Sequence, residues 1–212
     1  MTAASGNQGA TTASATKTPG LAPSQTVGPF FLHCLLRDDA RRNVLVGPQT
    51  AGERIRIEGR VLDGDGAPVA DAMVEIWQAN AAGRYRHPVD QRDDLPLDPD
   101  FIGFGRSGTD DTGAFWFETV RPGAVPFEAG RMQAPHIGLH VFARGLLNHL
   151  TTRLYFDGDP ANASDPVLLR VPDERRATLL ALRAPDSTAG GLPIYRFDIV
   201  LQGPGETAFF NV

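Results

Sequence analysis

Apolar and charged residues alternate in several short stretches of this 212-residue chain. In residues 54–61, Ile55, Ile57 and Val61 alternate with charged side chains. Such alternation, with a period of two, is typical of a strand that buries one face and exposes the other. The same pattern predicts further strands at 72–77, 115–120, 136–143 and 194–201.

Turn-forming sequences separate these predicted strands. They are DGDG at 63–66, TDDTG at 109–113 and RPG at 121–123. One helix is expected at about 173–183, because Pro172 and the two acids after it suit a first turn and Arg183 suits a last turn. Short strands at close spacing with one short helix predict an all-β fold, an antiparallel β-sandwich.

Composition divides the chain into three parts. Residues 1–22 are small and polar, with one Lys, no Arg and no apolar run. We therefore expect a disordered tail there, and neither a signal peptide nor a transit peptide. Residues 23–53 are expected to form an irregular N-terminal arm laid against another surface. Residues 54–212, which contain no linker, are expected to form the β-sandwich domain.

Charge and cysteine content exclude several classes of function. Lys and Arg number 20 against 25 Asp and Glu, which gives a net charge of −5. A nucleic-acid surface would require a basic excess. The single cysteine, Cys34, excludes a disulfide framework and a cysteine-rich zinc site. A buried or interfacial thiol is expected. With no apolar run long enough to cross a membrane, we expect a cytoplasmic protein.

Acidic residues gather at 90–100 in the sequence DQRDDLPLDPD. Carboxylates could bind calcium, but the prolines and the irregular spacing favour a solvated loop. The DGDG sequence resembles the start of an EF-hand. The position that requires a Glu holds Val74, so a hairpin turn is expected instead.

Several motifs in order resemble the intradiol ring-cleaving dioxygenases. They are SQTVGPF (24–30), WQANAAGRYRH (77–87), GRSGTDDTGAFWFETVRPGAVP (105–126), APHIGLHVFARG (134–145) and LTTRLYFDGD (150–159). The resemblance covers about residues 23–212. It implies a β-sandwich that cleaves a catechol ring with O2 at a non-haem Fe(III).

By this resemblance, two Tyr and two His bind the iron. The first tyrosine corresponds to Tyr85 and the first histidine to His136. The second tyrosine and histidine positions hold Val125 and Gly138, which carry no donor. Gln133 holds the place of an arginine that stabilises charge in the reaction. These five residues are expected to form a vestigial site that binds no metal.

His140 does not replace the missing histidine in this interpretation. It shares a strand face with His136, but four residues of strand separate the two by about 13 Å. One ion with bonds of about 2 Å to each nitrogen cannot bridge that distance. Chelation would require a bulge, so a hydrogen-bonded structural histidine is expected.

The pattern of losses is similar to the α subunits of the family's two-chain enzymes, which cleave protocatechuate in the β-ketoadipate pathway. The resemblance implies a β subunit as partner, an αβ protomer in a higher oligomer, and Fe(III) bound by the β subunit only. It also implies that an N-terminal strip walls the partner's substrate pocket. The residues of the strip are Thr26, Gly28, Pro29 and Phe30, and Arg144 corresponds to an arginine that points toward the same pocket. The family often has Tyr at the position of Phe30, so a hydroxyl role is lost there.

Alternatives remain for the strip and for the chain. Arg144 could pair with the substrate carboxylate or with a surface acid. The chain could be a self-sufficient dioxygenase with an atypical site made of Tyr85, His136 and an acid from 90–100. It could also be a non-enzymatic binding module, because residues 58–77 alone resemble transthyretin-like sandwiches.

Overall fold

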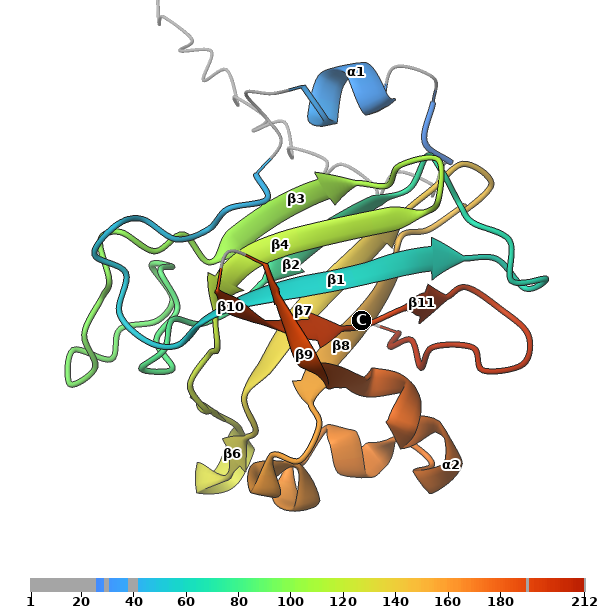
Figure 1. Cartoon of the computed structure of the whole chain (residues 1–212). Coiled ribbons are helices and arrows are strands. Elements are labelled where there is room, and N and C mark those ends of the chain that lie inside the picture. Colours follow the sequence, from blue (N-terminus) through green and yellow to red (C-terminus); the bar gives the residue numbers. More distant parts are fainter. Residues whose placement is uncertain (1–25, 29–30, 38–41, 190, 212) are drawn as a thin grey trace, which may run out of the picture.

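The computed structural model describes residues 26–28, 31–37, 42–189 and 191–211 (Figure 1). The expected tail at 1–22 lies outside these residues, as do Pro29 and Phe30. Among the described helices, none is long and apolar enough to span a membrane.

Strands make up most of the described secondary structure. They are β1 (Arg54–Leu62), β2 (Met73–Trp77), β3 (Phe104–Gly108), β4 (Ala114–Val120), β5 (Val125–Pro126), β6 (Met132–Gln133), β7 (His136–Phe142), β8 (Leu150–Phe156), β9 (Leu180–Ala189), β10 (Leu192–Arg196) and β11 (Ile199–Val200). The helices are α1 (Phe31–Leu35) and α2 (Asp173–Arg176), and the 3-10 turns are η1 (Glu128–Gly130), η2 (Pro160–Ser164), η3 (Leu168–Arg170) and η4 (Ala177–Leu179).

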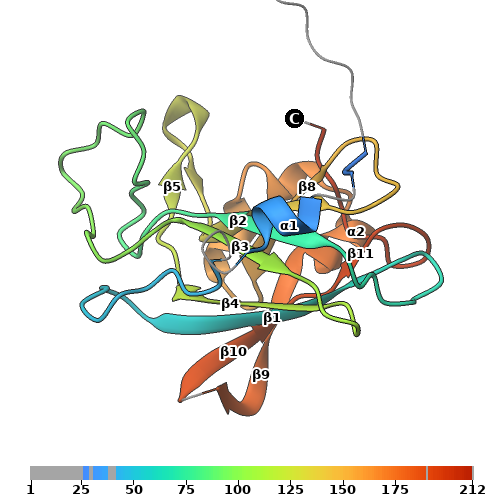
Figure 2. The same cartoon turned by 90° about the horizontal axis from the view of Figure 1, so that it is seen from above.

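Nine of the described strands form one nearly closed sheet, and β5 pairs with β6 in a separate two-stranded sheet. Its order is β11-β1-β10-β9-β8-β7-β2-β3, and β4 pairs with β1. β9 joins two layers, β3-β2-β7-β8 and β4-β1-β10, and the β9–β10 hairpin projects from the body (Figure 2). The expected all-β fold is confirmed. The sheet is mixed, however, because β1 runs parallel to β10 and β11, and β8 runs parallel to β9.

The core lies between the two layers. Ile55, Ile57 and Val61 of β1 are at most 1% exposed, as their alternation predicts. Phe117 of β4 and Leu139 of β7 meet them in the same cluster. Each such side chain contributes about 2 kcal/mol when it leaves water, so the alternating strands supply most of the driving force for folding.

Gly59 interrupts the apolar positions of β1 for a steric reason. A β-carbon there would lie 1.8 Å from the carbonyl oxygen of Phe197 and 2.8 Å from the ring of Phe115. Only glycine lets the backbone between β10 and β11 approach β1 this closely.

The predicted helix at 173–183 is wrong in its length. α2 ends at Arg176, a 3-10 turn follows, and β9 begins at Leu180. Leu180 pairs with Tyr155 of β8, while Arg183 pairs with Tyr195 of β10. Sheet pairing on both sides therefore overrides the helix-terminal signal that Arg183 was expected to provide.

The described part of the N-terminal arm lies on its own domain. Leu45 is 2% exposed, and its N–H donates to the carbonyl of Glu118 at 2.9 Å. α1 lies beyond β3, on the side opposite α2 (Figure 1). The expected contact between the arm and a partner subunit stays a prediction.

The acidic loop at 90–100 holds the arm in place. Asp98 accepts from the N–H of Ala51 at 2.8 Å, and Asp100 accepts from that of Gln49 at 2.9 Å. Within the described ranges, no group of three or more His, Cys, Asp or Glu could hold a metal ion. Asp98 and Asp100 thus bind backbone donors of the arm.

Candidate functional site

The WQAN sequence builds the turn that carries Tyr85. β2 ends at Trp77, and the Oδ1 atom of Asn80 accepts from the N–H groups of Ala82 and Arg84 at 3.0 Å each. An asparagine that bonds backbone groups two and four residues onward fixes a turn. The motif therefore sets the direction in which the chain leaves the sheet.

The PG turn packs directly on this turn. The N–H of Gly123 donates to the carbonyl of Asn80 at 3.0 Å. Gly83 has a φ of +81°, and a β-carbon there would lie 2.2 Å from the carbonyl oxygen of Ala124. This close approach requires glycine, and it places Val125 beside the segment that carries Tyr85.

Tyr85 is held on both its backbone and its ring. Its N–H donates to Asp90 at 2.8 Å, and its ring stacks on Trp77 with centroids 5.9 Å apart and planes 9° apart. Burial raises the pKa of the Tyr85 phenol, and the Arg153 and Arg92 guanidinium groups oppose this only in part. The phenol therefore stays protonated near neutral pH.

His136 opens β7 as a buried, neutral imidazole. It is 7% exposed, and Nδ1 lies 2.8 Å from the carbonyl oxygen of Ala134. Because a carbonyl only accepts, Nδ1 carries the proton and Nε2 has a free lone pair. Burial, and after it the Arg153 charge, lowers the pKa of His136 to about 4.

Arg153 lies at the centre of this site, directly across the β7–β8 ladder from Gly138. Its Nη1 donates to Oε1 of Gln133 at 2.6 Å and lies 3.5 Å from the hydroxyl of Tyr155. The Gln133 side chain in turn donates to the carbonyl of Pro126 at 3.0 Å. The glutamine thus holds a guanidinium group that comes from another strand.

A buried carboxylate holds the Tyr155 hydroxyl that Arg153 contacts. The Tyr155 hydroxyl donates to Asp165 at 3.1 Å, and Asp165 is fully buried. The same carboxylate accepts from the backbone N–H groups of Ala134, Val167 and Leu168. Four donors stabilise its charge, so the network has one fixed arrangement.

Two cavities adjoin at Tyr85. One has a volume of about 660 Å³ and includes Tyr85, His136 and Gly138 in its wall. The other, of about 730 Å³, includes Tyr85, Val125 and Gln133. The structure therefore brings all five residues of the expected vestigial site together. We call the first cavity the Arg153 pocket, because Arg153 also lines it.

His140 lines the Arg153 pocket but is separate from His136. The pairing of β7 with β8 runs without interruption from His136 to Val141, so no bulge brings the two histidines together. Nδ1 of His140 lies 3.2 Å from the Thr151 hydroxyl, and its ring contacts His149 at 5.1 Å. Burial and the neighbouring His149 lower the pKa of His140. This fits the expected structural histidine.

The residues around Tyr85 do not fit a ferric ion. Of the four expected ligand positions, Tyr85 and His136 carry donors, while the side chains at Val125 and Gly138 have none. The guanidinium of Arg153 interacts electrostatically with both Tyr85 and His136. A fixed positive charge within reach of both remaining donors opposes a trivalent cation there.

The expected strip lies at the other end of β7. The hydroxyl of Thr26 accepts from the N–H of Gly145 at 3.0 Å, which places Thr26 beside Arg144. The Arg144 side chain is 76% exposed and pairs with Asp71. The surface acid that we considered as an alternative is therefore present in this chain.

Other members of the strip make few contacts. Gly28 is exposed, and a β-carbon there would meet nothing within 4 Å. Pro29 and Phe30 lie outside the described residues. Cys34 is exposed in this chain, so the buried alternative for its thiol is wrong, and the interfacial alternative stays a prediction. Whether the strip walls a partner's pocket stays a prediction.

Arg153 and Arg170 were not singled out by the sequence analysis. Arg153 lies in the LTTRLYFDGD motif, where Thr151, Arg153 and Tyr155 share one strand face by their spacing of two. That spacing was the available signal. Arg170 lies in a 3-10 turn, and no pattern in the sequence connects it with β8.

Comparisons with known proteins agree with the motif resemblance. A family model described as "Dioxygenase" matches residues 27–203. The protocatechuate 3,4-dioxygenase alpha chain of Burkholderia cepacia is 44% identical over 200 residues, covering 90% of this chain and 96% of that relative. The beta chain from the same organism is 43% identical over 175 residues, covering 81% and 74%.

Solved structures agree on the fold. The dioxygenase domain of a carbohydrate-binding fusion protein from Streptomyces sp. SirexAA-E has a TM-score of 0.57 at 28% identity, covering 88% of this chain and 98% of that one. Catechol 1,2-dioxygenase from Acinetobacter sp. ADP1 has a TM-score of 0.58 at 22% identity, covering 74% and 55%. The second likeness concerns the fold alone.

Proposed function

Because the chain belongs to the intradiol dioxygenase family, we propose that it is the α subunit of a protocatechuate 3,4-dioxygenase whose Fe(III) is bound by the β subunit. The assembled enzyme cleaves protocatechuate with O2 between the two hydroxylated carbons and yields 3-carboxy-cis,cis-muconate. This chain is a subunit of that oxidoreductase and is inactive alone.

The main support is the set of side chains around Tyr85. A catalytic ferric site needs four donors in the pattern that the motifs resemble, and here two positions hold Val125 and Gly138. Arg153, across the ladder from Gly138, adds a positive charge beside the two donors that remain. A second chain that retains the donors has to supply the iron.

The lengths of the relatives also support the α assignment. The alpha chains of Burkholderia cepacia and Pseudomonas putida are covered over 96% and 95% of their lengths. The beta chain is covered over 74%, at nearly the same identity. The match therefore covers nearly the whole length of an alpha chain and about three quarters of a beta chain.

In this proposal the strip contributes to the partner's substrate pocket. Thr26 and Arg144 lie side by side on the surface, and Gly28, Pro29 and Phe30 follow Thr26 in the sequence. A cation at Arg144 would favour the carboxylate of protocatechuate over an uncharged catechol. Glycine and proline would give a rigid backbone close to a planar ring.

The decisive experiment measures iron and turnover in separate chains. The full chain is produced alone, its partner is produced alone, and the two are then combined. We expect iron to co-purify with the partner and with the complex but not with this chain. Protocatechuate-dependent O2 uptake should require the partner, and it should be highest in the complex.

The opposite distribution of iron would reverse the proposal. Stoichiometric iron in this chain alone, with ring cleavage, would identify a self-sufficient dioxygenase with an atypical site. If no chain binds iron and mixing does not raise turnover, the result would favour a non-enzymatic binding module.

A further inference from the structure

The Arg153 pocket has a consistent electrostatic character. Its wall contains three arginines and neither Asp nor Glu, although the whole chain has a net charge of −5. These arginines come from separate elements, with Arg153 on β8, Arg170 in η3 and Arg175 on α2. The fold therefore gathers positive charge at one cavity of an acidic protein.

Two of the three arginines have no acidic partner in the described part of the chain. Arg153 bonds only neutral groups, namely Gln133 and the Tyr155 hydroxyl, and both contacts use Nη1. Arg170 lies over the Phe127 ring, with 5.5 Å between its guanidinium carbon and the ring centroid. Arg175 does pair with an acid, Glu206, at 3.0 Å.

A half-buried guanidinium without a carboxylate partner is unusual, because most such charges are paired. Gln133 orients one edge of Arg153 and leaves Nε and Nη2 without a partner among the described residues. Those N–H groups match the two oxygens of a carboxylate in a bidentate arrangement. The pocket thus presents a charge-specific donor that is already in position.

Aromatic rings form much of the remaining wall. Trp77 and Tyr85 are stacked in parallel at one side, and Phe127 with Phe209 and Phe210 contributes further ring surface. The volume, about 660 Å³, is in the range of small-molecule pockets. Flat apolar walls and one fixed cation favour a planar ring that bears a negative charge.

We propose that the Arg153 pocket binds a small aromatic carboxylate in this chain itself, with the carboxylate on Arg153 and the ring among the aromatic side chains. The ligand is bound and not transformed, because the pocket lacks the donors for a ferric centre. The site is separate from the strip, which lies at the opposite end of β7. It does not depend on which chain binds iron.

The test uses the full chain without a partner, with 4-hydroxybenzoate as the probe. We expect saturable binding by calorimetry and quenching of tryptophan fluorescence, because Trp77 lines the pocket. Arg153→Gln should weaken binding by about tenfold or more, the usual loss for a charge-assisted bidentate pair. Arg170→Gln should weaken it by a smaller factor, because Arg170 is exposed and charge interactions there are screened.

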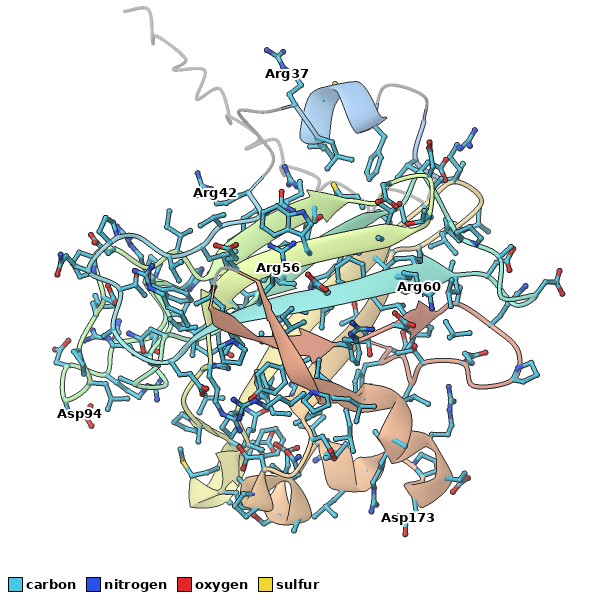
Figure 3. The ribbon with its side chains drawn as sticks, in the orientation of Figure 1. Arg37, Arg42, Arg56, Arg60, Asp94 and Asp173 are labelled. Carbon is cyan, nitrogen blue, oxygen red and sulfur yellow. The ribbon has the colours of Figure 1, made fainter. Side chains whose placement is uncertain are left out.

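A matched control variant and two further probes distinguish the contribution of the ligand's charge to binding from that of its aromatic ring. Arg60→Gln removes an exposed arginine of β1, which lies away from α2 and its Asp173 (Figure 3), and should leave binding unchanged. 4-Hydroxybenzamide keeps the ring without the charge, and inorganic phosphate keeps a charge without the ring. Both should bind about tenfold more weakly or worse.

Three results would overturn the proposal. The first is no binding of 4-hydroxybenzoate at millimolar concentration, and the second is equal binding by Arg153→Gln. The third is phosphate binding as tight as that of the aromatic acid, which would identify a plain anion site. If Arg153→Gln loses its fold, Gly138→Phe replaces it. A β-carbon at Gly138 meets only the Trp77 carbonyl, at 3.5 Å, so the ring can fill the pocket and should abolish binding.

Discussion

The two ends of β7 carry two very different sets of residues. At its start, His136 and the neighbouring Arg153 pocket are fixed by hydrogen bonds that reach the buried Asp165. Beyond its end, Arg144 is 76% exposed, and its contacts with Asp71 and the Thr26 segment are at the surface. Six residues of strand, or about 20 Å, separate the ends of β7.

The difference separates a site that this chain forms by itself from a surface that it leaves exposed. The start of β7 has a cavity and a cation that Gln133 and Tyr155 hold through one nitrogen, so its chemistry is determined within one chain. The far end presents exposed groups that have few partners within the described residues. A surface of that kind is suited to completing a site on another chain. The predictions below test each end separately.

The largest expected effect concerns the protonation of His136. Its folded pKa of about 4 lies below the unfolded value of 6.5, so above pH 6.5 both states are neutral and stability is complete. As the pH falls from 6.5 to 4, the unfolded chain takes up a proton that the folded chain excludes. The free energy of unfolding should therefore fall by up to about 3 kcal/mol from this group.

Urea unfolding at pH 7 and pH 4 measures this loss. The His136→Gln variant should lose less stability over that interval than the wild type, because it lacks the titrating ring. His87→Gln, which alters an exposed ring, serves as the matched control and should behave as the wild type. Identical losses in wild type and His136→Gln would mean that the imidazole is not buried as described.

The sequence was most informative where side chains alternate. β1, β2, β4 and β7 were predicted because each buries every second residue under the opposite layer. β3 and β8 were not predicted, since FGRSG and LTTRLYF mix small, polar and charged residues without an apolar alternation. Their pairing depends on neighbours that are distant in the chain. Parallel pairs were missed for the same reason.

For the site, the motifs predicted which residues come together, but they did not predict the positive charge of Arg153 among them. Tyr85, Val125 and Gly138 come together because close-packed glycine turns and sheet register impose it. Arg153 was missed, because a lone arginine in a strand ordinarily faces water. Only the β7–β8 register places it opposite Gly138, where no side chain competes for the space. Gly138, which lacks a donor, and Arg153, which carries the charge, are therefore adjacent in space although they are distant in sequence.

A second, smaller effect concerns restored iron ligands. Val125→Tyr with Gly138→His returns both missing donors, and a β-carbon at Gly138 has room. If Arg153 opposes a cation there, adding Arg153→Gln should strengthen Fe(III) binding by about tenfold or more. Titration of each purified variant against a competing chelator gives the affinities.

The comparison of iron affinities needs a control variant that removes a different arginine. Arg60→Gln added to the same two replacements removes an arginine on β1 and should not change iron affinity. Equal affinities with and without Arg153 would show that the guanidinium does not oppose the metal. In that case the missing donors alone would account for the poor fit.

The smallest expected effect is at the far end of β7. Arg144→Ala removes an exposed ion pair with Asp71, so the unfolding free energy of this chain should change by less than about 0.5 kcal/mol. In the complex with the proposed β subunit, the same variant should raise KM for protocatechuate about threefold, with kcat and iron content nearly unchanged. Arg60→Ala breaks a comparable exposed pair, with Asp198, and should alter neither quantity. An unchanged KM for Arg144→Ala would leave Arg144 as a surface ion pair only, because a residue that faces the substrate carboxylate cannot be removed without weakening its binding.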